Sequence, residues 1–184
     1  MSTNEVPNPP PYYEAFAKPV YPGAQLAYSA ATEKAESGVP TVVSSPALPY
    51  LGMIPNGMKI GKLIVVKLIV KPNPKRFHVN FQCGMCSNPR SDVALHFNPR
   101  FKDKTIVLNT LRNTRWDWRE QRPKIGFPLV PNGTYEIMFL CEKDKFNVAM
   151  NGLHLFEYKH RLPFQNISAL EIAGDCDVIE VQYN

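Results

Sequence analysis

The sequence lacks any apolar run long enough to cross a lipid bilayer as a helix. Its longest apolar stretch, residues 63–70, is interrupted by Lys67 and falls far short of the ~20 residues that a membrane-spanning helix needs. The first residues are polar and rich in proline, without the basic and apolar regions of a secretory signal. We therefore expect a protein that is made in the cytosol, stays cytoplasmic and does not insert into membranes.

Cysteine is scarce, with four residues in a chain of 184. In the cytosol these thiols should stay reduced. Cys83 and Cys86 have the spacing of half a zinc site, but Cys141 and Cys176 are isolated and supply no second pair. The chain also lacks a glycine-rich phosphate loop and a paired nucleophile and base. These absences predict no metal, no cofactor and no enzymatic activity.

Leucine, isoleucine and phenylalanine are rare in the first 49 residues, which instead hold nine of the 18 prolines. Such a composition cannot bury enough apolar surface to offset the entropy lost on ordering. We therefore predict a mostly disordered tail over residues 1–46 and one folded domain over residues 47–184. Within the tail, Pro9–Tyr12 matches the Pro-Pro-x-Tyr ligand of WW domains. A plain linker is the other interpretation of this stretch.

Acidic side chains are outnumbered by basic ones outside the tail. Residues 1–47 hold two of the 21 basic and four of the 16 acidic side chains, which leaves a net charge of +7 on the remainder. This balance favours association with acidic glycans, anionic surfaces or nucleic acid, and it selects none of them. A binder of anionic polymers is therefore one hypothesis, although no motif indicates nucleic acid as a partner.

No segment has the sustained 3.6-residue period of an amphipathic helix. From about Leu48 the chain consists of short β-type runs between turn signals. The pair Asn151-Gly152 lies between two alternating runs, which is the pattern of a tight hairpin. We predict an all-β domain, a two-sheet antiparallel jelly-roll β-sandwich. The predicted strands are residues 59–70, 76–82, 92–97, 105–109, 134–142, 146–150, 154–158, 167–172 and 178–183.

Residues 93–100 combine an apolar face with a polar one if they form a strand. The polar face carries His96, Asn98 and Arg100 in a row, so an imidazole, an amide and a guanidinium share one surface. Pro99 cannot donate to a ladder, and we expect the strand to loosen or end there. The remaining histidines, which we interpret as structural, are His78, His154 and His160.

Two later segments add polar side chains to this surface if their strands are neighbours. Residues 105–109 place Asn109 on the face of Val107, and residues 116–122 contain two Trp, Glu120 and Arg122. Amide, guanidinium and carboxylate groups together can bond the hydroxyls of a pyranose, and a Trp ring can cover its apolar C–H face. The patch therefore predicts a sugar-binding site.

The order of these residues resembles the signature of the galectins. His96-Phe-Asn-Pro-Arg100 is followed by Val107-Leu-Asn109 and then by a Trp with Glu120 and Arg122. The resemblance extends over about residues 48–184. Its further landmarks are Pro49-Tyr50, Phe81-Gln-Cys-Gly84, Phe127-Pro128, residues 146–152, His160-Arg161 and Ile172-Ala-Gly-Asp175.

The resemblance implies a sandwich of galectin and legume-lectin type that binds β-galactosides without a metal. Its ligands would be lactose-type and N-acetyllactosamine-type glycans on glycoproteins and glycolipids. The resemblance also implies export to the extracellular space without a signal peptide.

Each residue of the signature has a role that the resemblance implies. The three polar side chains of residues 93–100 would meet the axial 4-hydroxyl of galactose. Asn109 and Glu120 would take its 6-hydroxyl, and Trp116 would stack on the sugar. Glu120 and Arg122 would reach the adjoining sugar.

One spacing departs from the galectin pattern. Galectins place the Glu three residues after the stacking Trp, whereas here Glu120 follows Trp116 by four and Trp118 by two. One extra residue inverts the Trp relative to Glu120 unless a loop or bulge absorbs it. We favour Trp116 as the stacking ring, with Trp118 as the alternative. A galectin-like interaction protein with weak or lost galactoside binding is the alternative function.

Overall fold

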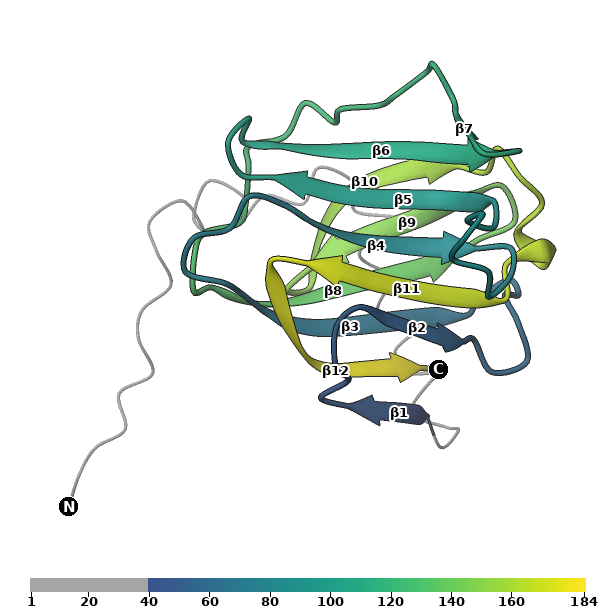
Figure 1. The fold of residues 1–184 in the computed structure, drawn as a ribbon, viewed down its shortest axis with the longest axis horizontal. Helices are drawn as coiled ribbons and strands as arrows, with labels where there is room; N and C mark the ends of the chain where they lie inside the picture. Colours follow the sequence, from purple (N-terminus) through teal and green to yellow (C-terminus); the bar gives the residue numbers. More distant parts are fainter. Residues whose placement is uncertain (1–39) are drawn as a thin grey trace.

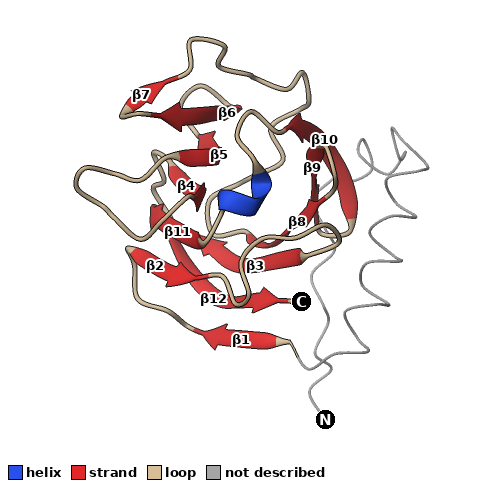
Figure 2. Cartoon of the chain, turned by 90° about the vertical axis from the view of Figure 1, so that its right-hand side faces the viewer, coloured by secondary structure: helices blue, strands red, loops and turns tan. Residues whose placement is uncertain are grey.

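The computed structural model describes residues 40–184, which form two antiparallel six-stranded sheets packed face to face (Figure 1, Figure 2). Sheet I has the strand order β2 (Tyr50–Met53), β11 (Ala169–Gly174), β4 (Phe77–Gln82), β5 (Val93–Arg100), β6 (Thr105–Arg112) and β7 (Arg115–Trp116). Sheet II has the order β1 (Thr41–Ser44), β12 (Cys176–Tyr183), β3 (Leu63–Val70), β8 (Thr134–Cys141), β9 (Lys145–Met150) and β10 (Leu153–Lys159). A 3₁₀ turn, η1 (Phe164–Asn166), precedes β11.

This architecture confirms the predicted all-β, two-sheet antiparallel sandwich. Every predicted strand overlaps an observed one, while the short strands β1, β2 and β7 were not predicted. No helix within residues 40–184 is long and apolar enough to cross a membrane.

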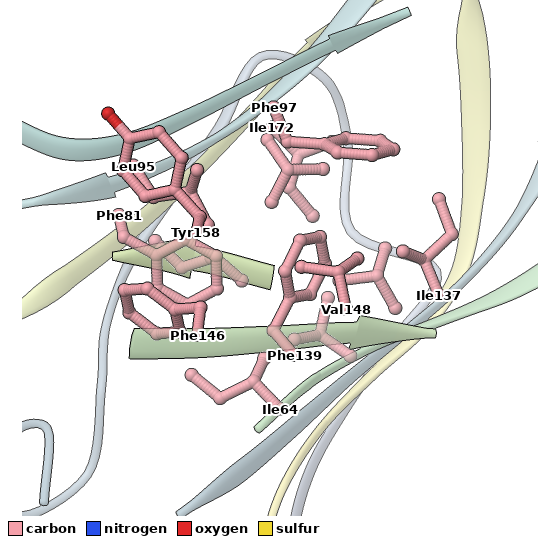
Figure 3. Packing of buried hydrophobic residues seen from close by; sticks show 14 of the residues in the cluster. Ile64, Phe81, Leu95, Phe97, Ile137, Phe139, Phe146, Val148, Tyr158 and Ile172 are labelled. Atoms are coloured by element: carbon pink, nitrogen blue, oxygen red, sulfur yellow. The ribbon is translucent and has the colours of Figure 1, made fainter. Parts of the chain in front are cut away.

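The core lies between the sheets and follows from the alternation of side chains along each strand. In β3, Ile64, Val66, Leu68 and Val70 face inward and are fully buried. Aromatic rings from both sheets meet in the middle, as Figure 3 shows. The ring of Phe139 lies 5.0 Å from that of Phe81 and 5.5 Å from that of Phe97, centroid to centroid. This packing holds β4 and β5 in place. The opposite face of these two strands carries polar side chains, His96 among them.

The Asn151-Gly152 turn forms the predicted hairpin between β9 and β10. Met150 pairs with Leu153 across it, and both turn residues have positive φ, 49° for Asn151 and 77° for Gly152. Positive φ at both central positions is what a type I′ turn requires, because its twist matches that of the flanking strands. This prediction is confirmed.

The predicted boundary of the tail is wrong at its end. Thr41–Ser44, within the proposed tail of residues 1–46, pairs with β12 along the edge of sheet II. The run of β-branched residues is too short, between Pro40 and Pro46, to stand out from a proline-rich stretch. Pairing with β12 orders it. The expected disorder of residues 1–39, and Pro9–Tyr12 with it, lies outside the described residues.

The strand does not end at Pro99, but its pairing loosens on one side there, which is the first of the two predicted outcomes. β5 continues to Arg100, and Pro99 pairs with Ile106 of β6. On the other side, the ladder with β4 stops at the Val79–Phe97 pair. The register puts Phe77 opposite Pro99, and the carbonyl oxygen of Phe77 accepts a hydrogen bond from Asn98 Nδ2 at 2.6 Å. The side-chain amide replaces the N–H that proline lacks.

Candidate functional site

A cleft of about 890 Å³ lies on the outer face of sheet I. The strands β4, β5, β6 and β7 form its floor, and the segment after β7 forms part of its wall. Its lining residues are Lys75, Arg76, His78, Arg90, His96, Asn98, Arg100, Val107, Asn109, Trp116, Asp117, Trp118, Glu120, Gly174 and Asp175.

The strand register places four polar side chains in one row across the sheet. Glu171 of β11 lies opposite Asn80 of β4, which lies opposite His96 of β5, which lies opposite Asn109 of β6. Directly opposite residues in antiparallel strands point to the same face. A contiguous polar row therefore crosses the sheet, perpendicular to the strands.

The imidazole of His96 is packed against Asn80 and Trp116, and its pKa is lowered. Its Nδ1 lies 2.5 Å from Asn80 Oδ1, and its ring lies 4.7 Å from the Trp116 ring, centroid to centroid. Burial lowers the pKa of His96 to about 3, and the positive charges of Arg100 and Arg90 act in the same direction. The imidazole is therefore neutral at physiological pH.

Asn98 and Arg100 are held to each other and to the cleft wall. Asn98 is almost fully buried, and its Oδ1 accepts a hydrogen bond from Arg100 Nε at 2.9 Å. A terminal nitrogen of Arg100 lies 3.7 Å from a carboxylate oxygen of Glu120. Glu120 in turn accepts a 2.8 Å hydrogen bond from Arg122 Nε. Each side chain keeps hydrogen-bonding capacity toward a ligand, because amides and guanidinium groups carry several donors or acceptors.

Asn109 anchors the segment that follows β7. Its Nδ2 donates to the carbonyl oxygen of Asp117 at 3.0 Å. The side chain of Asp117 accepts hydrogen bonds from the backbone and the guanidinium of Arg119, which hold the pKa of Asp117 well below its usual range. Arg161 lies across both residues, 3.4 Å from Asn109 Oδ1 and 3.7 Å from Asp117 Oδ2. The wall of the cleft is therefore preorganised by ionic hydrogen bonds.

A bulge accommodates the unusual spacing after Trp116. Leu111 pairs with Trp116, so an unbroken antiparallel ladder would put residue 119 opposite Leu108. Gln121 lies there instead, which leaves two extra residues between the two pairs. The extra residues bend out of the ladder, and Trp116 and Glu120 both line the cleft. Trp116 is 46% exposed, whereas Trp118 is 89% exposed.

Residues 49–183 match the family of galactoside-binding lectins. The chain belongs to this family, the galectins. Galectin-8 of Rattus norvegicus is 38% identical over 148 residues, which are 80% of this chain and 46% of that protein. Galectin-4 of the same organism is 36% identical over 141 residues, or 76% of this chain and 42% of that protein. This galectin chain therefore spans less than half the length of these relatives.

Solved galectin structures share the fold. The crystal structure of galectin LEC-6 from Caenorhabditis elegans has a TM-score of 0.70 and 24% identity, and covers 78% of this chain and 95% of its own. Sheep galectin-11 in complex with glycerol has a TM-score of 0.66 and 24% identity, and covers 76% of this chain and 100% of its own. These likenesses support the two-sheet sandwich as the galectin architecture.

Six of the seven site residues predicted for this galectin line the single cleft described above. Arg122 does not line it and instead holds Glu120. Among the histidines interpreted as structural, His78 lines the cleft, 5.6 Å from the His96 ring between ring centroids. The alternation of residues 76–82 carried this signal, because His78 shares a face with Asn80. The other unpredicted lining residues are Lys75, Arg76, Arg90, Asp117, Gly174 and Asp175.

All four cysteines are free thiols. Cys141 and Cys176 are buried, and burial raises the pKa of each to about 12. Burial also raises the pKa of Cys83 to about 11. These thiols are therefore protonated and unreactive at physiological pH.

Proposed function

We propose that the cleft on sheet I binds the galactose residue of β-galactosides, without a metal and without catalysis. The observation that carries the proposal is the convergence of His96, Asn98 and Arg100 on one cleft beside the ring of Trp116. This set offers a neutral imidazole, an amide and a guanidinium within the space of one hydroxyl-rich ring. Membership of the galactoside-binding lectins supports the choice of sugar.

The roles that we propose are those that the resemblance to galectins implies, and the donors and acceptors of each group are compatible with them. His96, Asn98 and Arg100 bond the axial 4-hydroxyl, the role that membership of the galectins implies for these three side chains. Asn109 and Glu120 bond the 6-hydroxyl, and the Trp116 ring covers the apolar face of the sugar. Arg122 orients Glu120 through their 2.8 Å hydrogen bond, and both residues reach the adjoining sugar of lactose or N-acetyllactosamine.

The affinity that we expect is modest. Six to eight hydrogen bonds, each contributing about 0.5–1.5 kcal/mol, oppose an association cost of at least ~4 kcal/mol. With bonds toward the upper end of this range the remainder is roughly −4 to −6 kcal/mol, which corresponds to a dissociation constant between about millimolar and tens of micromolar. Tight binding to glycoproteins or glycolipids would therefore depend on multivalency.

A lactose titration monitored by tryptophan fluorescence tests the proposal, with sucrose as the control sugar. We expect a saturable change with lactose and none with sucrose, together with retention of the protein on lactose resin. A flat response and no retention would overturn the proposal. They would favour a galectin-like interaction protein, whose main support is the extra residue after Trp116. Against that alternative, Trp116 and Glu120 both line the cleft.

We further propose a cytoplasmic origin, with export to the extracellular space without a signal peptide. Pro9–Tyr12 is proposed as a ligand for a WW-domain protein. Pull-down of the full chain by a WW domain, compared with Tyr12→Ala, tests the second proposal. Equal capture of both chains would refute it.

A further inference from the structure

A buried chain of hydrogen bonds links the cleft to β11, two strands away from His96. Asn80 Nδ2 donates to Glu171 Oε2 at 2.6 Å, and the other polar atom of the same amide, Oδ1, lies 2.5 Å from His96 Nδ1. Asn80 is fully buried, and Glu171 is 7% exposed. The three residues stand opposite one another in the sheet, so the backbone register itself sets the contacts.

Glu171 sets the direction of this chain of hydrogen bonds. Its carboxylate also receives Gln82 Nε2 at 2.8 Å and lies 3.1 Å from a guanidinium nitrogen of Arg90. Burial alone would raise the pKa of Glu171, but the His78 ring 3.4 Å away, the hydrogen bond from Asn80 and the charge of Arg90 lower it to about 2. An ionised carboxylate only accepts. The Asn80 amide must therefore turn its NH₂ group toward Glu171 and its oxygen toward His96.

The tautomer of His96 follows from the orientation of that amide. An oxygen acceptor beside Nδ1 requires the ring proton to sit on Nδ1, and a neutral imidazole then has its lone pair on Nε2. We propose that Glu171 and Asn80 are positioning residues, which fix His96 as the Nδ1–H tautomer so that Nε2 accepts a hydrogen bond from a ligand hydroxyl. This inference rests on the proposed galactoside site.

The tautomer determines which side chains of the cleft donate hydrogen bonds to a ligand and which accept them. Nε2 of His96 accepts, whereas the guanidinium of Arg100 only donates. One ligand hydroxyl can bond both groups at once, because it donates one hydrogen bond and accepts others. With the opposite tautomer, both groups would donate, and the hydroxyl proton would have no acceptor among these two side chains. An unsatisfied polar group of this kind weakens binding.

Burial keeps His96 neutral in either tautomer, and the charges of Arg100 on β5 and Arg90 in the loop before β5 act in the same direction. The ring of His78 faces it from β4. The carboxylates of Glu171 and Glu120 are already paired with other side chains. Glu171 binds Asn80, Gln82 and Arg90, and Glu120 binds Arg122. Loss of the Asn80 contact should therefore change the position of the ring proton and leave the charge unchanged.

Two matched substitutions test the inference in the full chain. Asn80→Leu removes the bond to Glu171 and the acceptor for His96. Gln82→Leu removes a bond to the same carboxylate from an equally buried residue, which lies opposite Val93 rather than His96. Both variants bear a similar structural cost, so a difference between them reports on His96. Nitrogen-15 NMR of the histidine side chains gives the tautomer without ligand, with His96→Gln for assignment, and lactose titration gives the affinity.

We expect the Nδ1–H tautomer of His96 in the unsubstituted chain and in Gln82→Leu, with lactose affinities within about twofold of each other. In Asn80→Leu we expect a shift toward the Nε2–H tautomer and a loss of lactose affinity of about five- to tenfold, the equivalent of one hydrogen bond. An Nε2–H tautomer in the unsubstituted chain, or an unchanged tautomer in Asn80→Leu, would overturn the inference. Since the tautomer is read without sugar, a failure of lactose binding would be distinguishable and would overturn only the proposed function.

Discussion

Replacement of Arg100 by alanine should abolish lactose binding while the domain stays folded. Within the protein, Arg100 makes a 2.9 Å hydrogen bond to Asn98 Oδ1 and a 3.7 Å ion pair with Glu120. Both groups of the ion pair are about one-third exposed, with side-chain exposures of 30% and 32%, so solvent screening limits its contribution to stability to roughly 0–1 kcal/mol. We therefore expect a small effect on thermal unfolding.

The effect on binding should be much larger than the effect on stability. A hydrogen bond from a charged donor contributes about 1.5–3 kcal/mol, and the loss of one from Arg100 to the sugar reduces affinity by roughly 10- to 150-fold. From a starting value near millimolar or tens of micromolar, the variant falls below retention on lactose resin.

Lactose-resin retention and calorimetric titration, each paired with a thermal melt, measure both effects. Lys102→Ala is the matched control, because Lys102 is an exposed cation on the turn directly after β5. It should leave retention unchanged. Retained lactose binding in Arg100→Ala, with the melt intact, would refute the site assignment.

Two further predictions concern the ring and the pH response. Trp116→Leu should abolish lactose binding and its fluorescence change, whereas Trp118→Leu should keep both, since Trp116 lies against His96 and Trp118 is 89% exposed; the reverse pattern would assign the stacking ring to Trp118. Because burial lowers the pKa of His96 to about 3, lactose affinity should stay constant from about pH 8 to pH 5, whereas an ordinary histidine titrates near 6.5. An unfolded chain takes up that proton near pH 6.5, so folding stability should decrease as pH falls from about 6.5 toward 3. A lactose affinity that falls with a midpoint near pH 6.5 would contradict the neutral imidazole.

Much of the fold could be predicted from local patterns. Alternation of apolar and polar residues located the longer strands, because the side-chain period of a strand is two wherever one face is buried. The Asn151-Gly152 pair predicted its hairpin, because few residues other than Asn and Gly tolerate the φ that the turn requires. The short strands β1, β2 and β7 carry too few residues to show a period. Their pairing with longer neighbours orders them.

The sequence predicted the composition of the candidate site but not the contacts between residues of different strands. His96, Asn98 and Arg100 alternate along one strand, so their common face follows from sequence alone. Alternation along its own strand puts His78 on the face of Asn80, but it does not show which residues of other strands lie beside His78. Only the antiparallel register puts it beside His96 and puts Glu171, 91 residues from Asn80 along the chain, within hydrogen-bonding distance of that amide.

The sequence by itself determined which side chains share a face, because that property depends on a two-residue period. It also determined the family, through the order of residues from His96 to Arg122. The tertiary structure alone decided that Trp116 and Glu120 line the same cleft as His96, and that Pro99 stays within a strand. It also decided which nitrogen of His96 faces Asn80. These features depend on the pairing of strands distant in sequence, and no local period records that pairing.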